Sequence, residues 1–276
     1  MSQPDVDPIW ESIRVEVQEA VQQEPMLANF FYGVVLNHRT LEDALTFLLA
    51  AKLESTTITA ISLRDLLVEA YENDPSIGAA VRRDLDAVKT RDPACRGYST
   101  PFLYFKGFHA IQSYRAAHYF WTHERRSLAL FLQSRISQVF AVDVHPAARI
   151  GSGILIDHAT GVVIGETAVI EDDVSMLHEV TLGGTGKEQG DRHPKIRRGV
   201  LIGAGTKILG NIEIGEGAKI GASSVVLDSI PPHSTAVGVP ARVVGEPSEE
   251  LPALNMDHLL GIGIDHPFVY GYGAGI

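Results

Sequence analysis

The second half of the chain carries an aliphatic residue at nearly every sixth position, a spacing that fits neither a helix nor an ordinary amphipathic strand. A period of six fits short strands joined by tight corners, in which each unit points one aliphatic side chain inward. Stacked coils of this kind bury a common apolar column, so the pattern predicts a parallel β-helix over residues 141–245. The repeating residues are Ile150, Ile156, Ile164, Ile170, Met176, Leu182, Ile196, Ile202, Ile208, Ile214, Ile220 and Val226.

The period breaks in two places, and both breaks contain a histidine. The first lies within residues 157–161, where eight positions separate successive aliphatic residues, and it holds His158. The second lies within residues 183–195, where a gap of fourteen positions replaces the twelve that would keep register, and it holds Arg192 and His193. This second segment is too polar and glycine-rich to pack in a coil, so we expect it to loop outward. We therefore expect the functional residues of the β-helix at these two breaks.

The first 140 residues have the apolar spacing of amphipathic helices. Thr40 and Asp74 occupy positions typical of helix N-caps, because acidic residues follow the first and proline follows the second. A third helical region is expected from Thr100 to Phe140, with a break near His123. The predicted fold class is α+β, with an α-helical domain over 1–140, a β-helix over 141–245, and a flexible, exposed C-terminal tail over 246–276.

Composition narrows the classes of function. A net charge of −11 argues against nucleic acid as the main partner, since phosphate neutralisation needs clustered lysines and arginines. Residues 187–242 carry 8 basic and 5 acidic side chains, which fits either a small anionic ligand or a mixed solvated surface. Cys95 is the only cysteine, so no intrachain disulfide can form and a reducing cytoplasm is the expected location. We expect no secretory signal and no membrane span.

Asp143 and His158 lie fifteen positions apart, about one coil, and adjacent coils bring strands to within about 4.8 Å of each other. A carboxylate beside an imidazole fixes the ring tautomer and stabilises the imidazolium that forms when the ring takes a proton. This arrangement suits removal of a proton from a hydroxyl nucleophile. The alternative is that His158 only caps a corner and that Asp143 is a surface acid.

Arg192 lies in the second break, where its guanidinium fork suits a carboxylate. The alternative is a solvated loop charge, but two histidines and an arginine at the only breaks of a regular repeat favour a site. Residues 183–187 resemble a phosphate cradle, although the helix pattern that should follow is missing. Cys95 is interpreted as an ordinary thiol, and His178 as a solvated or corner residue.

Six short motifs run from the helical half into the β-helix half: 91–94 (RDPA), 98–101 (YSTP), 106–110 (KGFHA), 157–168 (DHATGVVIGETA), 181–186 (TLGGTG) and 190–196 (GDRHPKI). Together they closely resemble bacterial serine acetyltransferases, and the resemblance covers nearly the whole chain. It implies a left-handed parallel β-helix and a homohexamer built from two trimers. It also implies transfer of an acetyl group from acetyl-CoA, a co-substrate that is not permanently bound, to the hydroxyl of L-serine. The products are O-acetyl-L-serine and CoA, in the first step of cysteine biosynthesis; no metal is implied, and L-cysteine is the expected feedback inhibitor.

The resemblance also implies roles for particular residues in the two breaks and in the helical half. The implied roles are His158 as general base with Asp143 as its orienting partner, His193 as a further catalytic residue, Arg192 and His193 at the serine carboxylate, and Asp92 and Asp157 at the serine ammonium.

CoA is expected in a groove between neighbouring β-helices. There Gly184, Ala204 and Gly205 would allow close backbone approach, and Lys219 and Arg242 are candidates for the phosphates.

The C-terminal residue is expected to bind a partner protein, and three alternative functions stay open. By the same resemblance, Ile276 docks into the active site of O-acetylserine sulfhydrylase. The runner-up acceptor is another hydroxyl compound. A zinc-dependent β-helical lyase would instead use His158, His178 and His193 as ligands. A non-catalytic scaffold that recruits a partner through its tail is the third alternative.

Overall fold

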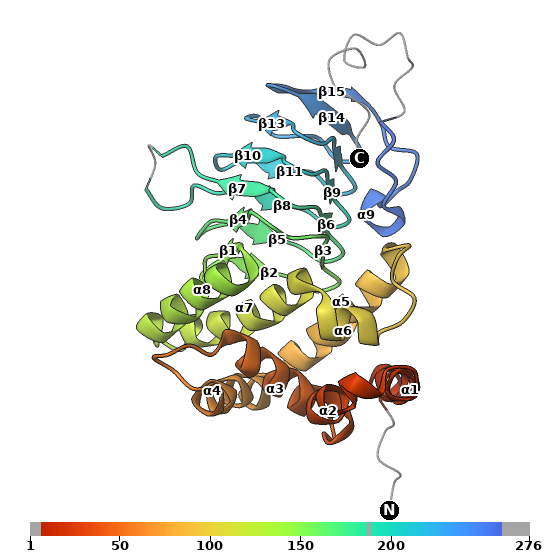
Figure 1. Ribbon diagram of the computed structural model, residues 1–276. Coiled ribbons are helices and arrows are strands. Elements are labelled where there is room, and N and C mark those ends of the chain that lie inside the picture. The colour runs from red at the N-terminus through yellow and green to blue at the C-terminus, as the bar shows by residue number, and fades with distance from the viewer. Residues whose placement is uncertain (1–6, 187–188, 261–276) are drawn as a thin grey trace, which may run out of the picture.

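The computed structural model describes residues 7–186 and 189–260, and it consists of two parts. Helices form a layer at the N-terminal end, and a column of short strands rises from that layer (Figure 1). An α-helical domain followed by a parallel β-helix confirms the predicted fold class. Ile276, the expected partner contact, lies outside the described residues.

Local sequence signals start several helices where the structure has them. The side chains of Thr40 and Asp74 each accept a hydrogen bond from a backbone N–H of the first turn, which confirms both predicted N-caps. The region 100–140 is broken at Phe105 as well as near His123. None of the helices in the described residues combines the length and the apolarity of a membrane span. The helices are α1 (Pro8–Gln23), η1 (Pro25–Leu27), α2 (Ala28–Phe31), η2 (Tyr32–Leu36), α3 (Leu41–Leu53), α4 (Ala60–Asn73), α5 (Pro75–Arg91), α6 (Ser99–Tyr104), α7 (Lys106–Thr122) and α8 (Arg126–Phe140).

The strands form three sheets, one for each side of the coil. The first sheet has the order β1-β4-β7-β10-β13, the second β11-β8-β5-β2, and the third β15-β14-β12-β9-β6-β3. All neighbours pair in parallel except β15, which runs antiparallel to β14 at the far end of the column. The strands are β1 (Val142–Val144), β2 (Arg149–Ile150), β3 (Leu155–Ile156), β4 (Val162–Ile164), β5 (Val169–Ile170), β6 (Ser175–Met176), β7 (Thr181–Gly183), β8 (Lys195–Ile196), β9 (Leu201–Ile202), β10 (Lys207–Leu209), β11 (Glu213–Ile214), β12 (Lys219–Ile220), β13 (Val225–Val226), β14 (Thr235–Gly238) and β15 (Ala241–Gly245).

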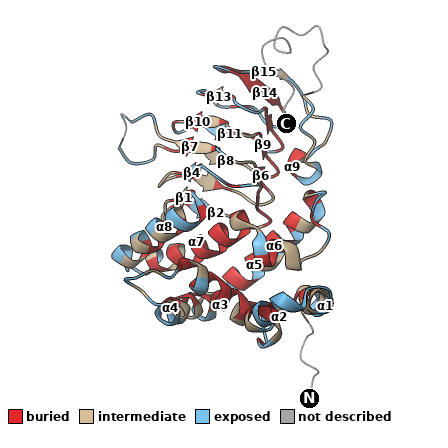
Figure 2. Ribbon diagram, viewed as in Figure 1, coloured by how far each residue is buried: buried red, intermediate tan, exposed pale blue. Residues whose placement is uncertain are grey.

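The six-residue period marks a column of buried side chains. In the first sheet Ile164 pairs with Leu182, Leu182 with Ile208, and Ile208 with Val226, so these inward residues stack one above another. Each of them is at most 1 % exposed, and Figure 2 shows buried positions recurring along the column. Ile150, the first residue of the series, is only partly buried and packs against this core. The predicted inward positions therefore form the core of the β-helix.

A buried ion pair joins the helical half to the first coil. The Arg115 guanidinium of α7 donates to the Asp84 carboxylate of α5 at 2.6 Å, and the two side chains are 8 % and 1 % exposed. Asp84 also accepts a hydrogen bond from the Ile154 N–H, and Arg115 donates to the Gly151 carbonyl. Each buried charge is thus satisfied by its partner and by the backbone of the coil, as a buried pair requires.

A second buried arginine ties the end of α5 to the β-helix. Arg91 donates to the Gly153 carbonyl at 2.8 Å and to the Ser175 hydroxyl at 3.2 Å. Ser175 donates in turn to the Ala253 carbonyl at 2.9 Å. Because Asp92 directly follows Arg91, these bonds hold Asp92 close to the coils.

The segment 246–260 packs in part against the β-helix. Its helix α9 (Pro252–Asn255) begins with two buried residues. Lys219 donates to the Leu259 carbonyl, and its ammonium lies 3.7 Å from the Asp257 carboxylate. The expectation of an exposed tail is wrong for this packed stretch, because its apolar and polar groups find partners on the coils.

Candidate active site

The first break in the repeat forms a corner between the third sheet and the first. The extra residues fit because His158 and Ala159 adopt left-handed backbone conformations, with φ of 55° and 58°. Two such residues in succession are unfavourable, so the packing around them has to stabilise the corner. The start of α7 supplies that packing: a Cβ on Gly107 would lie 2.1 Å from the Ile156 carbonyl oxygen. The glycine in the motif at 106–110 is explained by this close approach.

The His158 ring projects from this corner. Its side chain is 74 % exposed, and Nε2 lies 3.7 Å from a carboxylate oxygen of Asp157. The ring of His178 meets it edge to face, with the ring centroids 5.9 Å apart. Asp143, on β1, accepts a hydrogen bond from Gln133 at 2.7 Å. The carboxylate beside His158 in this chain is therefore that of Asp157, and the pairing of His158 with Asp143 stays a prediction.

The second break forms a corner between the first sheet and the second. Here the backbone N–H groups of Arg192 and His193 both donate to the Thr167 hydroxyl oxygen, at 3.0 and 3.1 Å. The Thr167 N–H donates to Nδ1 of His193 at 3.2 Å, so the neutral ring carries its proton on Nε2. A Cβ on Gly165 would lie 2.0 Å from the His193 ring, which leaves room for glycine alone. The second corner thus fixes both the position and the tautomer of His193.

The charges at the second corner suit an anion. Arg192 donates to the Glu166 carboxylate at 2.7 Å, and this hydrogen bond lowers the pKa of Glu166. Burial, and then the charge of Arg192, lowers the pKa of the His193 imidazole. The corner therefore presents a cation held by Glu166 and, beside it, a neutral imidazole that can donate from Nε2. A guanidinium and a ring N–H together can recognise a carboxylate.

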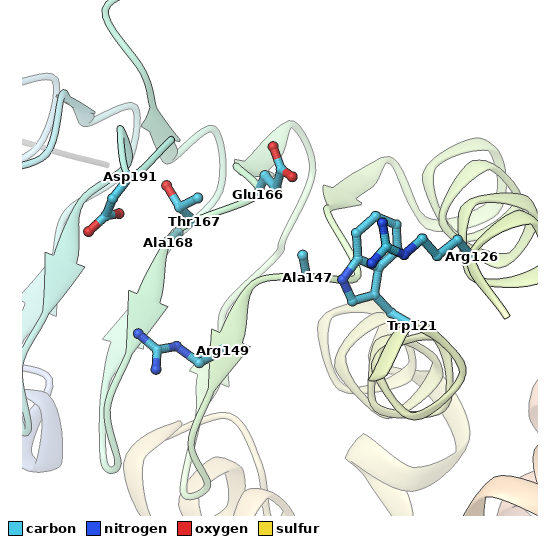
Figure 3. Close-up of a pocket in the computed structure, with 8 residues that line it drawn as sticks. All are labelled: Trp121, Arg126, Ala147, Arg149, Glu166, Thr167, Ala168 and Asp191. Carbon is cyan, nitrogen blue, oxygen red and sulfur yellow. The ribbon is translucent and has the colours of Figure 1, made fainter. Parts of the chain in front are cut away.

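A cavity of about 440 Å³ opens beside the second corner (Figure 3). The β-helix contributes the acids Glu166 and Asp191 and the cation Arg149, while the helical half contributes Trp121 and Arg126. The sequence gives no sign of Arg149, Trp121 and Arg126, because they belong to no motif and only the fold brings them together. Glu166, in contrast, lies in the motif 157–168. The lining residues are Trp121, Arg126, Ala147, Arg149, Glu166, Thr167, Ala168 and Asp191.

The two corners stand at opposite edges of the first sheet. The chain enters β4 after the first corner, and it leaves β7 for β8 through the second. About five extended residues span one side of a coil, which is roughly 15 Å. One chain therefore does not bring His158 and His193 together.

Asp92 belongs with the first corner. Its side chain accepts a hydrogen bond from the Ala94 N–H at 2.8 Å, which fixes the loop after α5. Cys95 of this loop packs against Leu155 of β3, two residues before Asp157. The carboxylates of Asp92 and Asp157 are thus carried by neighbouring segments. The expected ammonium site and the expected carboxylate site lie on different corners.

The expected CoA-contact residues are divided between the two corners. The Gly205 N–H donates to the His178 carbonyl at 3.0 Å, so Ala204 and Gly205 lie two coils above the first corner, on the same edge. Gly184 lies at the second corner, where an added Cβ would be 3.4 Å from the Arg192 carbonyl oxygen. A single chain therefore supplies these backbone contacts at two separate edges.

The two basic candidates for the CoA phosphates differ in accessibility. The Arg242 side chain is 59 % exposed and lies 3.9 Å from Asp228. The Lys219 side chain is 3 % exposed, because residues 257–259 cover its ammonium. Arg242 is open to an anionic ligand, whereas Lys219 is covered in this arrangement.

The zinc alternative finds no support in the described part of the chain. No group of three or more His, Cys, Asp or Glu side chains there is arranged to hold a metal ion. His158 and His178 are neighbours, but His193 belongs to the other corner.

The repeat fold and its reactive corners define the class, a transferase built on hexapeptide repeats. Residues 193–228 match the family model described as bacterial transferase hexapeptide (six repeats). Residues 9–113 match the model for the N-terminal region of serine acetyltransferase. The chain belongs to the serine acetyltransferase family, and it is an acyltransferase.

The similarity to known members extends over the whole chain. The serine acetyltransferase of Escherichia coli (strain K12) is 56% identical over 273 residues, which cover 99% of this chain and 100% of that protein. A structure of a serine acetyltransferase in complex with cysteine is 58% identical, with a TM-score of 0.89 over 91% of this chain and 98% of the other. The serine acetyltransferase of Brucella abortus strain S19 in complex with coenzyme A is 54% identical, with a TM-score of 0.86 over 87% of this chain and 96% of the other.

Proposed function

We propose that this chain transfers the acetyl group of acetyl-CoA to the hydroxyl of L-serine, giving O-acetyl-L-serine and CoA. This reaction is the first step of cysteine biosynthesis from serine. The observation that carries the proposal is the division of chemistry between the corners. One corner has an exposed imidazole beside a carboxylate, and the other has a cation beside a neutral imidazole. Relatives crystallised with cysteine and with coenzyme A support the amino-acid and thioester substrates.

Acetyl transfer needs one proton acceptor. His158 takes the proton of the serine hydroxyl while the oxygen attacks the thioester carbonyl carbon. The resulting tetrahedral intermediate collapses by breaking the carbon–sulfur bond, and the imidazolium returns the proton to the CoA thiolate. A carboxylate stabilises the imidazolium in between; Asp143 is the proposed partner, and Asp157 lies nearest in this chain. Acetyl-CoA is a co-substrate in this scheme.

Serine offers a carboxylate and an ammonium to be recognised. Arg192 and the Nε2–H of His193 are proposed to hold the carboxylate, and Asp92 and Asp157 the ammonium. L-cysteine differs from serine by one atom, so it fits the same site and inhibits by competition. Inhibition by cysteine that is independent of serine concentration would place it at a separate site.

A complete site needs two copies of the chain, because the proposed carboxylate and ammonium subsites lie on different corners about one coil side apart. The first corner of one copy and the second corner of the next would supply all the groups, and a closed ring satisfies every copy. This supports a closed oligomer as the minimal active unit, and by the family resemblance we propose a trimer, with two trimers forming a homohexamer.

Complementation between inactive variants tests the shared site. His158→Ala and Arg192→Ala chains, each inactive alone, are co-expressed and purified as mixed oligomers. Random assembly should restore roughly a quarter of the wild-type sites, because some interfaces then pair two intact corners. Absence of any recovery in verified mixed oligomers would contradict a site shared between copies.

CoA is proposed to lie between neighbouring copies, along the coil edges at Gly184, Ala204 and Gly205, with its phosphates near Arg242. Lys219 is proposed to join the phosphates only when residues 257–259 leave its ammonium. Lys219→Glu should raise KM for acetyl-CoA far more than KM for serine. Equal effects on both would indicate a folding defect.

The chain end and the location of the enzyme are further proposals. We propose that Ile276 anchors the chain in O-acetylserine sulfhydrylase and that the enzyme works in the cytoplasm. Deleting Ile276 should abolish the complex and leave acetyl transfer intact. Unchanged co-elution of the sulfhydrylase with the truncated enzyme would exclude this anchor.

An acceptor panel tests the reaction itself. Release of CoA thiol from acetyl-CoA is measured with L-serine, D-serine, L-threonine, glycerol and a sugar. L-serine should give by far the highest kcat/KM, because only it offers a hydroxyl, an ammonium and a carboxylate in the right geometry. A higher kcat/KM with the sugar or with glycerol would favour the alternative of another hydroxyl acceptor.

A further inference from the structure

His178 occupies the place on its coil that the proposed base, His158, occupies on the coil below. Ile156 pairs in register with Met176, and each histidine follows two positions later. Ala204 takes the same place on the next coil, because the register continues. The order along this edge is therefore His158, then His178, then a proposed contact for CoA.

The His178 ring is in contact with the His158 ring. The two ring centroids are 5.9 Å apart and the ring planes meet at 74°, which is the edge-to-face geometry that aromatic rings prefer. The other close group, the Asp157 carboxylate, lies 3.7 Å from Nε2, beyond a normal hydrogen bond. A ring that is 74 % exposed on a left-handed corner has few contacts to select one rotamer. The His178 ring supplies such a contact.

Hydrogen bonding through the buried ring nitrogen does not explain why a histidine stands at position 178. Its Nδ1 atom is buried without a hydrogen-bond partner among residues 7–186 and 189–260. A buried polar atom without a partner costs stability. The contact that the structure does give this side chain is the edge-to-face one with the His158 ring.

We propose that His178 is a positioning residue for acetyl transfer. Its ring holds the His158 imidazole in the orientation from which it takes the hydroxyl proton. The inference rests on the proposed role of His158 as the base, and His178 acts through that ring without touching the reacting atoms.

Three substitutions in the full-length enzyme separate ring contact from other roles. His178→Ala removes the ring, His178→Leu keeps much of the volume without a flat ring, and His178→Phe keeps the ring without its nitrogens. The first two should lower kcat about 3- to 10-fold, with KM for serine and acetyl-CoA changed less than about 2-fold. His178→Phe should stay within about 2-fold of wild type. A matched control is His123→Ala, which breaks a ring contact with Tyr119 at 4.1 Å in the helical half and should leave kcat unchanged.

A double-mutant cycle provides the decisive readout. If His178 acts through His158, then adding His178→Ala to His158→Ala should not lower the residual rate further. An equal loss in both backgrounds would overturn the inference, as would normal kcat in both His178→Ala and His178→Leu. A loss in His178→Phe as large as in His178→Ala would also overturn it, because the ring would then not be sufficient. Failure of the proposed base is distinguishable, since His158→Ala would then turn over normally by itself.

Discussion

The helical half buries an ion pair and other polar side chains in its interior, whereas the inward column of the β-helix is aliphatic and the reactive groups lie at corners. Asp84, Gln112 and Arg115 form a buried hydrogen-bonded cluster between α5 and α7. His109 is buried as well, with its Nε2 2.7 Å from the Phe102 carbonyl oxygen. The inward column of the β-helix, in contrast, consists of isoleucine, leucine, methionine and valine.

Geometry explains this difference. Each inward residue of a coil stacks on its equivalents about 4.8 Å above and below, so a polar group there would face apolar neighbours on both sides. Helices of different direction leave room for side chains to meet and satisfy one another. Polar groups in the helical half therefore stabilise the fold, and those of the corners remain available for chemistry. Substitutions in the two regions should have separable effects on turnover and on stability.

The largest expected effect is at the first corner. His158→Ala should lower kcat by about 10²–10⁴-fold, the usual contribution of a general base. The midpoint of thermal unfolding should stay within a few degrees of wild type, because an exposed ring contributes little to packing. Steady-state thiol release and calorimetry measure both. Normal turnover, or a large loss of stability, would contradict the proposal that the corners contribute to turnover and not to stability.

The opposite result, a loss of stability without a loss of turnover, is expected at the buried ion pair of Asp84 and Arg115. Arg115→Met should lower the free energy of unfolding by about 3–5 kcal/mol, because it leaves Asp84 as an unpaired buried charge. The value of kcat for the folded fraction should be unchanged. Urea unfolding gives the stability, and the double variant Asp84→Leu/Arg115→Met should regain part of the loss. A variant that is fully stable but inactive would contradict the comparison.

Acid should destabilise the helical half through His109. Burial lowers the pKa of this imidazole from 6.5 to about 4. The unfolded chain therefore binds the proton first as pH falls, so stability is full above about pH 6.5 and is lost progressively down to about pH 4. The loss from this group amounts to about 3 kcal/mol. Unfolding measured across this range in wild type and His109→Phe should show a flatter pH dependence in the variant; identical slopes would exclude His109 as the cause.

The smallest effect is expected at the half-exposed ion pair of Arg192 and Glu166 at the second corner. Glu166→Gln should raise KM for serine about 3-fold, because Arg192 loses a partner that orients its guanidinium in a site with access to water. The value of kcat should hardly change. Comparison with Glu213→Gln, which breaks another arginine pair on the same β-helix, controls for general charge effects. Equal KM values in the two variants would argue against orientation by Glu166.

The sequence predicts the β-helix closely because one residue type recurs at one spacing. Its inward positions, from Ile164 to Val226, are set by local period alone. The pair Asp84–Arg115 has no such signal, since its partners lie on separate helices and contact a third segment at Ile154. The packed segment around α9 was also missed, because only the folded coils provide the surface that it covers.

The site was predictable where it coincides with a break in the repeat. That logic locates His158, Arg192 and His193, which the structure has at corners. Spacing alone could not decide which carboxylate lies beside His158, because corner geometry determines which side chain points toward the ring. The contact between His178 and His158 could not be predicted either, because their register on adjacent coils depends on the two residues inserted at the first break.

The two ends of the strand column have a consequence for the behaviour of the protein in concentrated solution. A stack of parallel coils ends in unpaired backbone groups, which can template the addition of strands from other molecules and the growth of fibres. Helices α7 and α8 pack against the first strands at one end, and at the other end β15 reverses direction against β14. At that end β15 occupies the edge of the third sheet, while β13 and β11 are the last strands of the first and second sheets. The helices and the antiparallel last strand therefore cover one end of the column and part of the other, which should limit end-to-end addition of coils even though most of the strands are only two or three residues long.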